Sequence, residues 1–446
     1  MRKTFPTPRL HSFRTRRSER GITLMFVVVA IFALLGVAAL AIDLVTLYVS
    51  KAEAQRVADA AALAGAKGLI DSGVTADPSN SQNNWSDACD QATAQAQGVA
   101  AQGKIGGSPP PTGNVTITFG SAGALGACPN SGAAGTGFGV NPEIGVTVRS
   151  AALPLFLAKI WGQRSSTVSA TALAEGFNPS GTNVPVATRC VTPWIMPNID
   201  PINSSGTTVV PIINTANGQI QNPGLTGTLF QDIGLLVGCS PGNCGALTGP
   251  GFTTGGGGLK RVTYYPADLG APAASGPSCS LATNYENNIV ACNPAPIACG
   301  DQIPIESAIY PDGPGGPNTN AVQCLTNAAA TGFGQGQDTL ATGGFPFTMH
   351  AGNNNPLVVN GTISTNDVIS SSRSVVNIPI YNSTYNVAPT SPVTVIGFAQ
   401  AFVQDVSGSG RPRIRVLNVS GCQLPRTNTP VGTNSASSVP VRLIHP

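Results

Sequence analysis

Charge is what this sequence has least of. Only 10% of its 446 residues are Asp, Glu, Lys or Arg, whereas about 25% is usual in a soluble domain. Lysine is scarce, so neutral Asn, Ser and Thr side chains must cover most of the surface. The 53 glycines and 37 prolines make up about a fifth of the chain, which indicates many turns and loops but stays below the level of a wholly disordered chain.

The positive charges are concentrated at the N-terminus. Residues 1–20 hold seven of the 23 basic side chains and one acid, Glu19. The basic residues of this tail are Arg2, Lys3, Arg9, Arg14, Arg16, Arg17 and Arg20. The rest of the chain is slightly acidic, with 16 basic against 19 acidic residues. Because a nucleic-acid-binding domain needs a basic patch on its folded part, we expect no nucleic-acid partner.

Charge is entirely absent from residues 22–42. These 21 residues contain one hydroxyl, that of Thr23, and as a helix they would span roughly 30 Å, the thickness of a bilayer core. We therefore predict a transmembrane helix in contact with lipid. The basic tail places residues 1–20 in the cytoplasm and the bulk of the chain outside. Asp43 then falls at the outer interface, where we expect an interfacial charge and not a functional intramembrane acid.

Two cleavage sites compete with retention of this segment. Residues 38–41 read "AALA", the small-residue spacing of a signal peptidase site, but the apolar run before them is longer than a signal-peptide core. Gly21 precedes the apolar run as the processed glycine of a type IV prepilin does. Prepilins usually carry Glu five residues after the cut, and Phe26 stands there instead. We therefore expect the tail and the helix to be retained.

The helical pattern continues beyond the apolar segment. No Pro or Gly follows Asp43 until Gly65, and alanine, the best helix former, is frequent. Residues that recur at three-to-four-residue spacing predict one buried face. They are Leu44, Leu47, Tyr48, Val57, Ala58, Ala61 and Ala64. The spacing predicts a single helix that runs from the bilayer to about Ala66.

This N-terminal region resembles that of TadG-like proteins of the Flp pilus, or tight adherence (Tad), system. The resemblance covers about 50 residues: an Arg-Gly entry, the apolar span, an aliphatic-Asp-aliphatic exit at 42–44, and a run that carries Tyr48, Gln55 and Asp59 and ends at Ala64. It implies a single-pass protein of the bacterial inner (cytoplasmic) membrane, with an extracytoplasmic domain and a role in pilus assembly or surface attachment. It does not imply prepilin processing.

A small α+β domain is predicted next, over residues 71–176. One helix is expected within 83–103 and another, shorter, at 153–162, and alternating patterns predict strands at 114–119, 143–150 and 164–176. The last strand unit also resembles the end of the small domain in Tad pseudopilin-like proteins. A sheet of three or four strands on the outer half of the long helix would bury its alanine face. Phe156 and Trp161 are expected in this core.

Residues 177–446 show no long helical period. Short β-branched runs separated by Gly, Pro and Asn predict a large, loop-rich all-β domain. These runs lie at 209–214, 260–265, 356–363, 375–381, 393–406 and 411–420. The fold class is therefore α+β. The predicted divisions are a cytoplasmic tail (1–20), the membrane helix with its extension (21–70), the small pseudopilin-like domain (71–176) and the β-rich domain (177–446).

All ten cysteines lie beyond the membrane helix. They are Cys89, Cys128, Cys190, Cys239, Cys244, Cys279, Cys292, Cys299, Cys324 and Cys422. An even number in an exported domain predicts disulfides, and the absence of paired two-residue gaps disfavours zinc. The plausible pairs are Cys89 with Cys128, Cys239 with Cys244 across a turn, and Cys190 with Cys422; the other four stay open.

Residues 405–409, "DVSGS", fit the Asp-x-Ser-x-Ser pattern of a metal-dependent adhesion site. Such a site belongs to a von Willebrand A domain, in which several strand–helix units follow the motif, and only 37 residues follow Ser409 here. We instead predict a β-hairpin in which strands Val393–Val406 and Arg411–Ser420 flank a Ser-Gly-Ser-Gly turn.

Histidine is too rare for most catalytic sites. Beyond the tail there are only His350 and His445, and neither lies near a Gly-x-Ser-x-Gly motif. Residues 284–288, "NYENN", are expected to form a loop. We predict no catalytic, cofactor-binding or metal-binding residue, and no enzymatic activity.

The function predicted is that of a membrane-anchored structural or assembly component of a Flp (Tad) pilus or related envelope attachment system. It would act through contacts with other pilus-assembly or envelope proteins. An anchored adhesin or glycan-binding module is the alternative, since Asn/Gly-rich loops suit one. A membrane-anchored hydrolase is the least favoured hypothesis.

Overall fold

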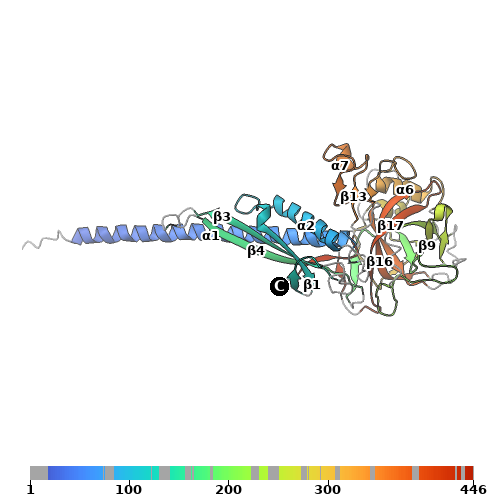
Figure 1. Cartoon of the computed structure of the whole chain (residues 1–446), viewed down its shortest axis with the longest axis horizontal. Coiled ribbons are helices and arrows are strands. Elements are labelled where there is room, and N and C mark those ends of the chain that lie inside the picture. The colour runs from blue at the N-terminus through green and yellow to red at the C-terminus, as the bar shows by residue number, and fades with distance from the viewer. Residues whose placement is uncertain are drawn as a thin grey trace, which may run out of the picture.

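The computed structural model describes residues 19–73, 75, 85–121, 123–129, 141–155, 162, 165–180, 184–221, 231–239, 251–272, 279, 281–291, 293–306, 312–341, 347–383, 391–426, 429–432 and 437–444. Phe156, Trp161, Cys244, Cys292 and His445 lie outside these residues, as does most of the predicted 153–162 helix. The molecule is elongated, with a long helix at one end, a small α/β layer around that helix, and a larger β-rich part at the other end (Figure 1).

Helix α1 (Glu19–Asp71) is a single unbroken helix of 53 residues, roughly 80 Å long at 1.5 Å per residue. Its first half projects alone, and its second half lies inside the small domain (Figure 1). The uninterrupted helix predicted from the sequence is confirmed, and it ends at Asp71, five residues beyond the expected Ala66.

Helix α2 (Trp85–Gln102) packs along the second half of α1. Small residues make the contact close: a Cβ added at Gly68 of α1 would lie 2.8 Å from the Ala92 Cα of α2. The predicted alanine face is buried, and it includes Val57, Ala58 and Ala61. The prediction is wrong for the part of this face that follows residue 42, because Leu44 and Tyr48 are exposed. In that stretch of α1 the buried side chains include Asp43 and Ser50 instead.

A five-stranded antiparallel sheet lies against α1, in the order β19-β4-β3-β1-β2. Its strands are β1 (Val115–Ser121), β2 (Ala124–Gly126), β3 (Glu143–Pro154), β4 (Ser165–Gly176) and β19 (Val441–Ile444), and a 3-10 turn, η1 (Thr112–Asn114), precedes β1. The strands predicted at 114–119, 143–150 and 164–176 are thus confirmed as β1, β3 and β4.

The outer strand of this sheet, β19, comes from the end of the chain. Val441 of β19 pairs with Gly176 of β4, and Ile444 pairs with Leu173. Just beyond them the Phe177 N–H donates to the Pro440 carbonyl at 2.9 Å. The chain therefore leaves the small sheet and returns to it at one point, so the large domain is inserted between two neighbouring strands. The sequence analysis did not predict this return.

The large domain is built on a sheet that closes on itself. The order β16-β15-β6-β9-β7-β17 becomes a ring because β17 also pairs with β16, while β11 and β8 add to its edges. These strands are β6 (Trp194–Pro197), β7 (Asp232–Val237), β8 (Phe252–Thr254), β9 (Lys260–Pro266), β11 (Gln302–Ile303), β15 (Val375–Tyr381), β16 (Val393–Val406) and β17 (Pro412–Gly421). A large apolar core that includes Trp194, Ile378 and Ile414 is associated with it.

Two smaller sheets complete the β structure. One has the order β10-β5-β18 and the other the order β12-β13-β14. Their strands are β5 (Val186–Thr188), β10 (Ile297–Ala298), β18 (Val431–Gly432), β12 (Thr339–Leu340), β13 (Met349–His350) and β14 (Val368–Ile369). The β-rich architecture predicted for the large domain is confirmed. The run at 209–214 is an exception, because it forms no strand and contributes only an isolated bridge between Ile213 and Ile220.

The large domain also contains short helices that were not predicted: α5 (Asn284–Val290), α6 (Pro317–Thr326), α7 (Pro356–Val359) and a 3-10 turn, η3 (Gly256–Gly258). The loop expected at 284–288 is wrong, because Thr283 and Glu286 form a capping box that starts α5. The strand expected at 356–363 is wrong for a similar reason. Asn355 caps α7 and Pro356 occupies its first turn.

Three disulfides form between described cysteines. Cys89 bonds to Cys128, as expected, and Cys279 bonds to Cys324. Cys422 bonds to Cys299, so the predicted Cys190–Cys422 pair is wrong. The Cys422 N–H donates to the Ile396 carbonyl and the Gly300 N–H donates to the Val395 carbonyl, so neighbouring residues of β16 bring the two cysteines together. Cys190 and Cys239 are also disulfide-bonded, and no described cysteine is free.

Candidate membrane anchor and interdomain cleft

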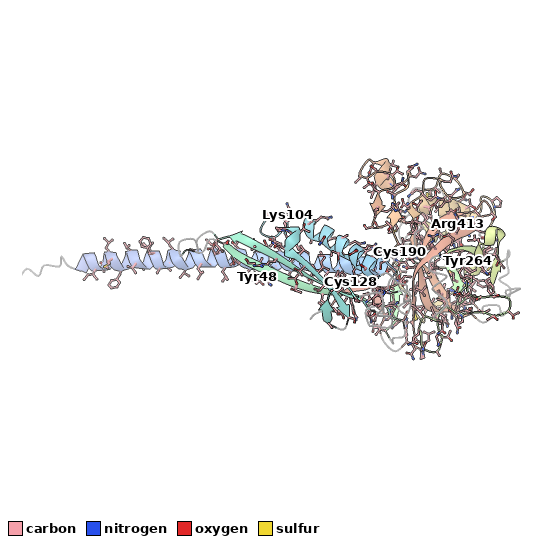
Figure 2. The ribbon with its side chains drawn as sticks, viewed as in Figure 1. Tyr48, Lys104, Cys128, Cys190, Tyr264 and Arg413 are labelled. Atoms are coloured by element: carbon pink, nitrogen blue, oxygen red, sulfur yellow. A yellow bond between two sulfur atoms is a disulfide. The ribbon has the colours of Figure 1, made fainter. Side chains whose placement is uncertain are left out.

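The first half of α1 exposes a long apolar surface. Leu24 is 67% exposed and Phe32 is 70% exposed, and most of the other apolar side chains of residues 22–42 are exposed too, whereas Ala39 is buried. Side chains extend above and below the helix in this part of the view (Figure 2). The segment is long and apolar enough to cross a membrane. Asp43, at its end, is only 3% exposed and has an interaction partner within the protein.

Polar side chains join α1 to the small sheet directly after this segment. Lys51 Nζ donates to the Ser169 carbonyl, and Gln55 Nε2 donates to the Thr171 carbonyl at 3.2 Å. Both carbonyls belong to the part of β4 that β19 does not cover. Helix side chains therefore cap an edge that would otherwise be open to pairing with another strand.

Gln55 and Asp59 are bonded to each other on α1. Gln55 Nε2 also donates to Asp59 Oδ1, at 2.7 Å. The carboxylate orients the amide, and the second amide proton reaches Thr171 on the strand. Tyr48, in contrast, is 78% exposed and lies at the end of the bare half of α1 (Figure 2).

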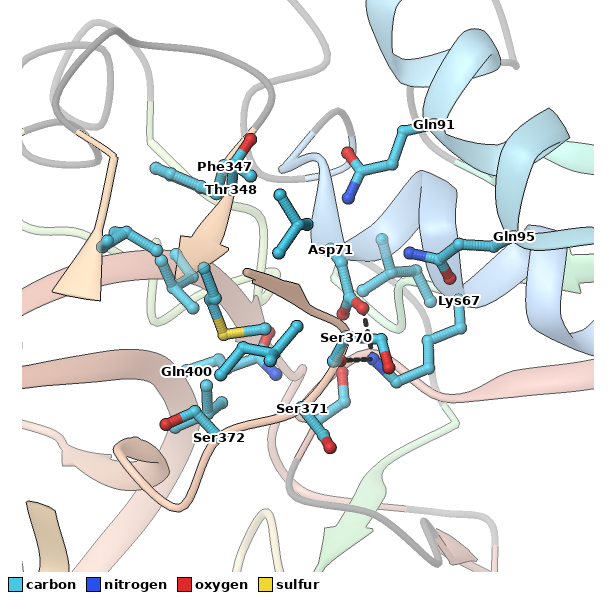
Figure 3. A pocket seen from close by; sticks show the side chains of 18 of the residues that line it. Lys67, Asp71, Gln91, Gln95, Phe347, Thr348, Ser370, Ser371, Ser372 and Gln400 are labelled. Atoms are coloured by element: carbon cyan, nitrogen blue, oxygen red, sulfur yellow. Dashed lines mark hydrogen bonds and ion pairs between the residues drawn. The ribbon is translucent and has the colours of Figure 1, made fainter. Parts of the chain in front are cut away.

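A cleft of about 540 Å³ lies between the two domains, at the far end of α1. One wall comes from α1 and α2 and includes Ile70 and Ala94. Its polar side chains are Lys67, Asp71, Gln91 and Gln95 (Figure 3). The facing wall comes from the large domain and is largely apolar. Its members include Leu340, Phe347, Met349, Val368, Ile369 and Leu417.

The charges of the cleft are paired with each other. Lys67 Nζ contacts Asp71 Oδ2 and donates to the Ser370 carbonyl at 3.4 Å, so it also links the two domains. Burial raises the pKa of the Asp71 carboxyl above its ordinary value, and the Lys67 ammonium partly opposes this effect. The cleft therefore presents no net charge from this pair.

Further hydrogen bonds hold the two domains together beside the cleft. Asn418 Nδ2 donates to Thr75 Oγ1 at 2.8 Å, and Asn178 Nδ2 donates to the Thr75 carbonyl at 3.0 Å. Thr75, which follows the end of α1, is thus tied to the large domain by two short, buried hydrogen bonds.

The "DVSGS" motif forms a hairpin turn. Strands β16 and β17 pair in antiparallel order, and Asp405 contacts Arg413 on the opposite strand. Ser407 Oγ and Ser409 Oγ lie 2.9 Å apart and interact with each other. The predicted hairpin is confirmed. Among the described residues, no group of three or more His, Cys, Asp or Glu side chains is arranged to hold a metal ion.

A buried polar network lies beneath α6 in the large domain. Asn318 Nδ2 donates to the Tyr264 hydroxyl at 2.7 Å, and its Oδ1 accepts from the Tyr285 hydroxyl at 2.9 Å. Asp312 accepts from Asn318 Nδ2 and from the Val237 N–H, each at 3.3 Å. Burial raises the pKa of Asp312 to about 6. The sequence analysis missed this network, because its members come from distant segments.

The N-terminal region matches one family model. Residues 21–68 match the family described as putative Flp pilus-assembly TadE/G-like. This range covers the bare half of α1 and its entry into the small domain, so the N-terminal region of the chain is TadE/G-like. Neither a curated protein nor a solved structure matches the chain.

Proposed function

We propose that this protein, whose N-terminal region is TadE/G-like, is a membrane-anchored structural component of a Flp (Tad) pilus or a related envelope attachment system. It crosses the inner membrane once, with residues 1–20 in the cytoplasm and the folded domains outside. It acts through contacts with other pilus-assembly or envelope proteins and has no enzymatic activity.

One observation carries the proposal: α1 is a single helix with two different environments, within the segment that matches the family. Its first half is apolar and exposed, and its second half is the central element of a folded domain. A helix of this kind places the domain at the membrane surface without a flexible linker. The basic tail supports the orientation, because positive charge is retained on the cytoplasmic side.

Cell fractionation tests the anchor. The full chain should remain in the membrane pellet after a carbonate wash, and a Leu34→Arg/Leu35→Arg variant should move largely to the soluble or aggregated fraction, because charges at the middle of a span oppose insertion. Leu357→Arg/Val359→Arg is the matched control, since it places two arginines at exposed apolar positions of the large domain. A wild-type chain recovered in the soluble fraction would contradict the anchor.

Protease protection and co-purification test the rest. In spheroplasts, added protease should digest the large domain and leave an epitope on residues 1–20 intact. Solubilised complexes should contain proteins encoded with the pilus machinery. An accessible N-terminal epitope would contradict the orientation, and a chain that purifies alone after gentle cross-linking would contradict the assembly role.

A further inference from the structure

The interdomain cleft has two walls of different chemistry, and neither the anchor nor the fold requires it to be open. Its apolar wall leaves hydrophobic surface uncovered: Val368, on the edge strand β14, is 68% exposed. Its volume of about 540 Å³ lies within the roughly 300–1,000 Å³ typical of ligand-binding sites.

Two of the polar side chains on the α1–α2 wall are amides. Gln91 and Gln95 lie one turn apart on α2 and extend from it towards the cleft (Figure 3). Gln91 Oε1 is buried and accepts no hydrogen bond from any described residue. A buried acceptor without a donor is costly, about 1–3 kcal/mol. The wall is therefore complementary to a ligand that brings an N–H group.

The facing wall offers the edge of a sheet. β14 is the outer strand in the order β12-β13-β14, and among the described residues it pairs with β13 alone. Lys67 of the opposite wall donates to the Ser370 carbonyl, which shows that backbone groups at the end of β14 face the cleft. An exposed strand edge accepts an extended peptide through main-chain hydrogen bonds.

We propose that this cleft binds an extended, uncharged peptide segment with apolar side chains. Its backbone lies between the edge of β14 and the glutamine amides of α2, and one of its N–H groups donates to Gln91 Oε1. Its apolar side chains contact Phe347, Met349 and Val368. A charged segment is disfavoured, because Lys67 and Asp71 already neutralise each other.

An acyl chain is the competing occupant of an apolar cleft of this size. It has no N–H group to offer Gln91, and it leaves the edge of β14 without partners. The hydrogen-bonding groups of both walls therefore favour a peptide over a lipid. The assignment of this peptide to an assembly partner rests on the proposed function, whereas the binding itself does not.

The test uses the full chain in nanodiscs and an array of capped hexapeptides in which Val, Ile, Leu or Phe alternate with Ser or Thr. We expect saturable binding to a subset of these peptides. Ala94→Trp should weaken it at least tenfold, because Ala94 is an exposed residue that lines the cleft. Ala101→Trp is the matched control: it lies on the same helix, two turns away, is exposed and does not line the cleft. It should bind like the wild type.

Gln91→Leu separates a peptide from a lipid. It should weaken binding of the selected peptide at least fivefold and leave binding of decanoate unchanged or stronger. A blank array, equal binding by both tryptophan variants, or a cleft that takes decanoate in preference to every peptide would overturn the proposal. Membrane fractionation of the same variants should match the wild type, so failure here is distinguishable from failure of the anchor.

Discussion

At the residue scale, Asp312 is a buried carboxyl whose pKa is shifted into the range of ordinary experiments. Its carboxylate is held by Asn318, the Val237 N–H and Arg411, yet burial outweighs these contacts and raises its pKa to about 6. The protonated form is therefore favoured in the folded protein relative to the unfolded chain. The contribution of this group to stability is largest at low pH and falls as the pH rises from about 4 to above 6.

Asp312→Asn tests this effect. The wild type loses the contribution of Asp312 as the pH rises, whereas asparagine does not ionise. The free energy of unfolding of the variant, relative to that of the wild type, should therefore be about 2 kcal/mol higher at pH 7 than at pH 4. Urea denaturation of the full chain in mild detergent, at both pH values, measures the difference. A difference that does not change with pH, or that changes in the opposite direction, contradicts the assignment.

Gln55 belongs to the sequence pattern shared with the TadG-like family, and the structure shows which contacts it makes. It bonds to Asp59 on its own helix and to Thr171 on β4. The sequence marked both residues through the family resemblance. It could not show that they cap a strand edge, because β4 lies more than a hundred residues away.

At the scale of elements, replacing two helical glycines by alanine should have opposite effects on stability. A Cβ at Gly68 would lie 2.8 Å from the Ala92 Cα, whereas a Cβ at Gly98 would contact nothing within 4 Å. Gly98→Ala should raise the free energy of unfolding by about 0.5–1 kcal/mol through helix propensity. Gly68→Ala should lower it by about 1–2 kcal/mol, because the two helices must move apart.

Thermal melting of both variants, each compared with the wild type in the same detergent, measures these effects. The same substitution on neighbouring helices controls for the change in propensity. Stabilisation by Gly68→Ala would show that the contact between α1 and α2 is looser than described.

The elements that could be predicted were those with a long or clean pattern. Helix α1, helix α2, strands β1, β3 and β4, and the β16–β17 hairpin followed from periodicity and turn residues. The short helices α5 and α7 could have been found from their caps, since Thr283 and Glu286 fit the Thr-x-x-Glu signature. Strand β19 could not, because four residues carry no period and its partner β4 is distant in sequence.

At the scale of the whole molecule, the Cys299–Cys422 bond closes the longest loop of the three described disulfides. It joins residues separated by 123 positions, so its removal frees a long loop in the unfolded chain. Cys299→Ser/Cys422→Ser should lower the free energy of unfolding by about 2–5 kcal/mol. Urea denaturation without reductant measures this value, and a change below about 1 kcal/mol contradicts it.

The closed sheet, the cleft and most cysteine pairs could not be predicted, since each depends on contacts between distant segments. The cleft is the clearest case. Its walls combine Gln91, Met349 and Val368, which no motif connects. The domain divisions proposed from composition stay a prediction, but the pairing of β19 with β4 shows that the small sheet includes residues from both ends of the folded chain.

Removal of the insertion tests whether the small domain is complete without it. A chain in which a short Gly-Ser-Gly bridge joins Phe177 to Pro440 should stay folded in the membrane and retain the Cys89–Cys128 bond. The bridge should fit because the Phe177 N–H already donates to the Pro440 carbonyl at 2.9 Å. Circular dichroism and thiol counting check this. The same chain truncated before Val441 is the control and should melt at a lower temperature.

The meeting of β4 and β19 also has an evolutionary consequence. A segment whose two ends lie side by side can be gained, lost or exchanged in a single recombination event without breaking the sheet that carries it. The small domain would keep its sheet through such an exchange. The family match, over residues 21–68, lies within α1, which stays on the small-domain side of the insertion.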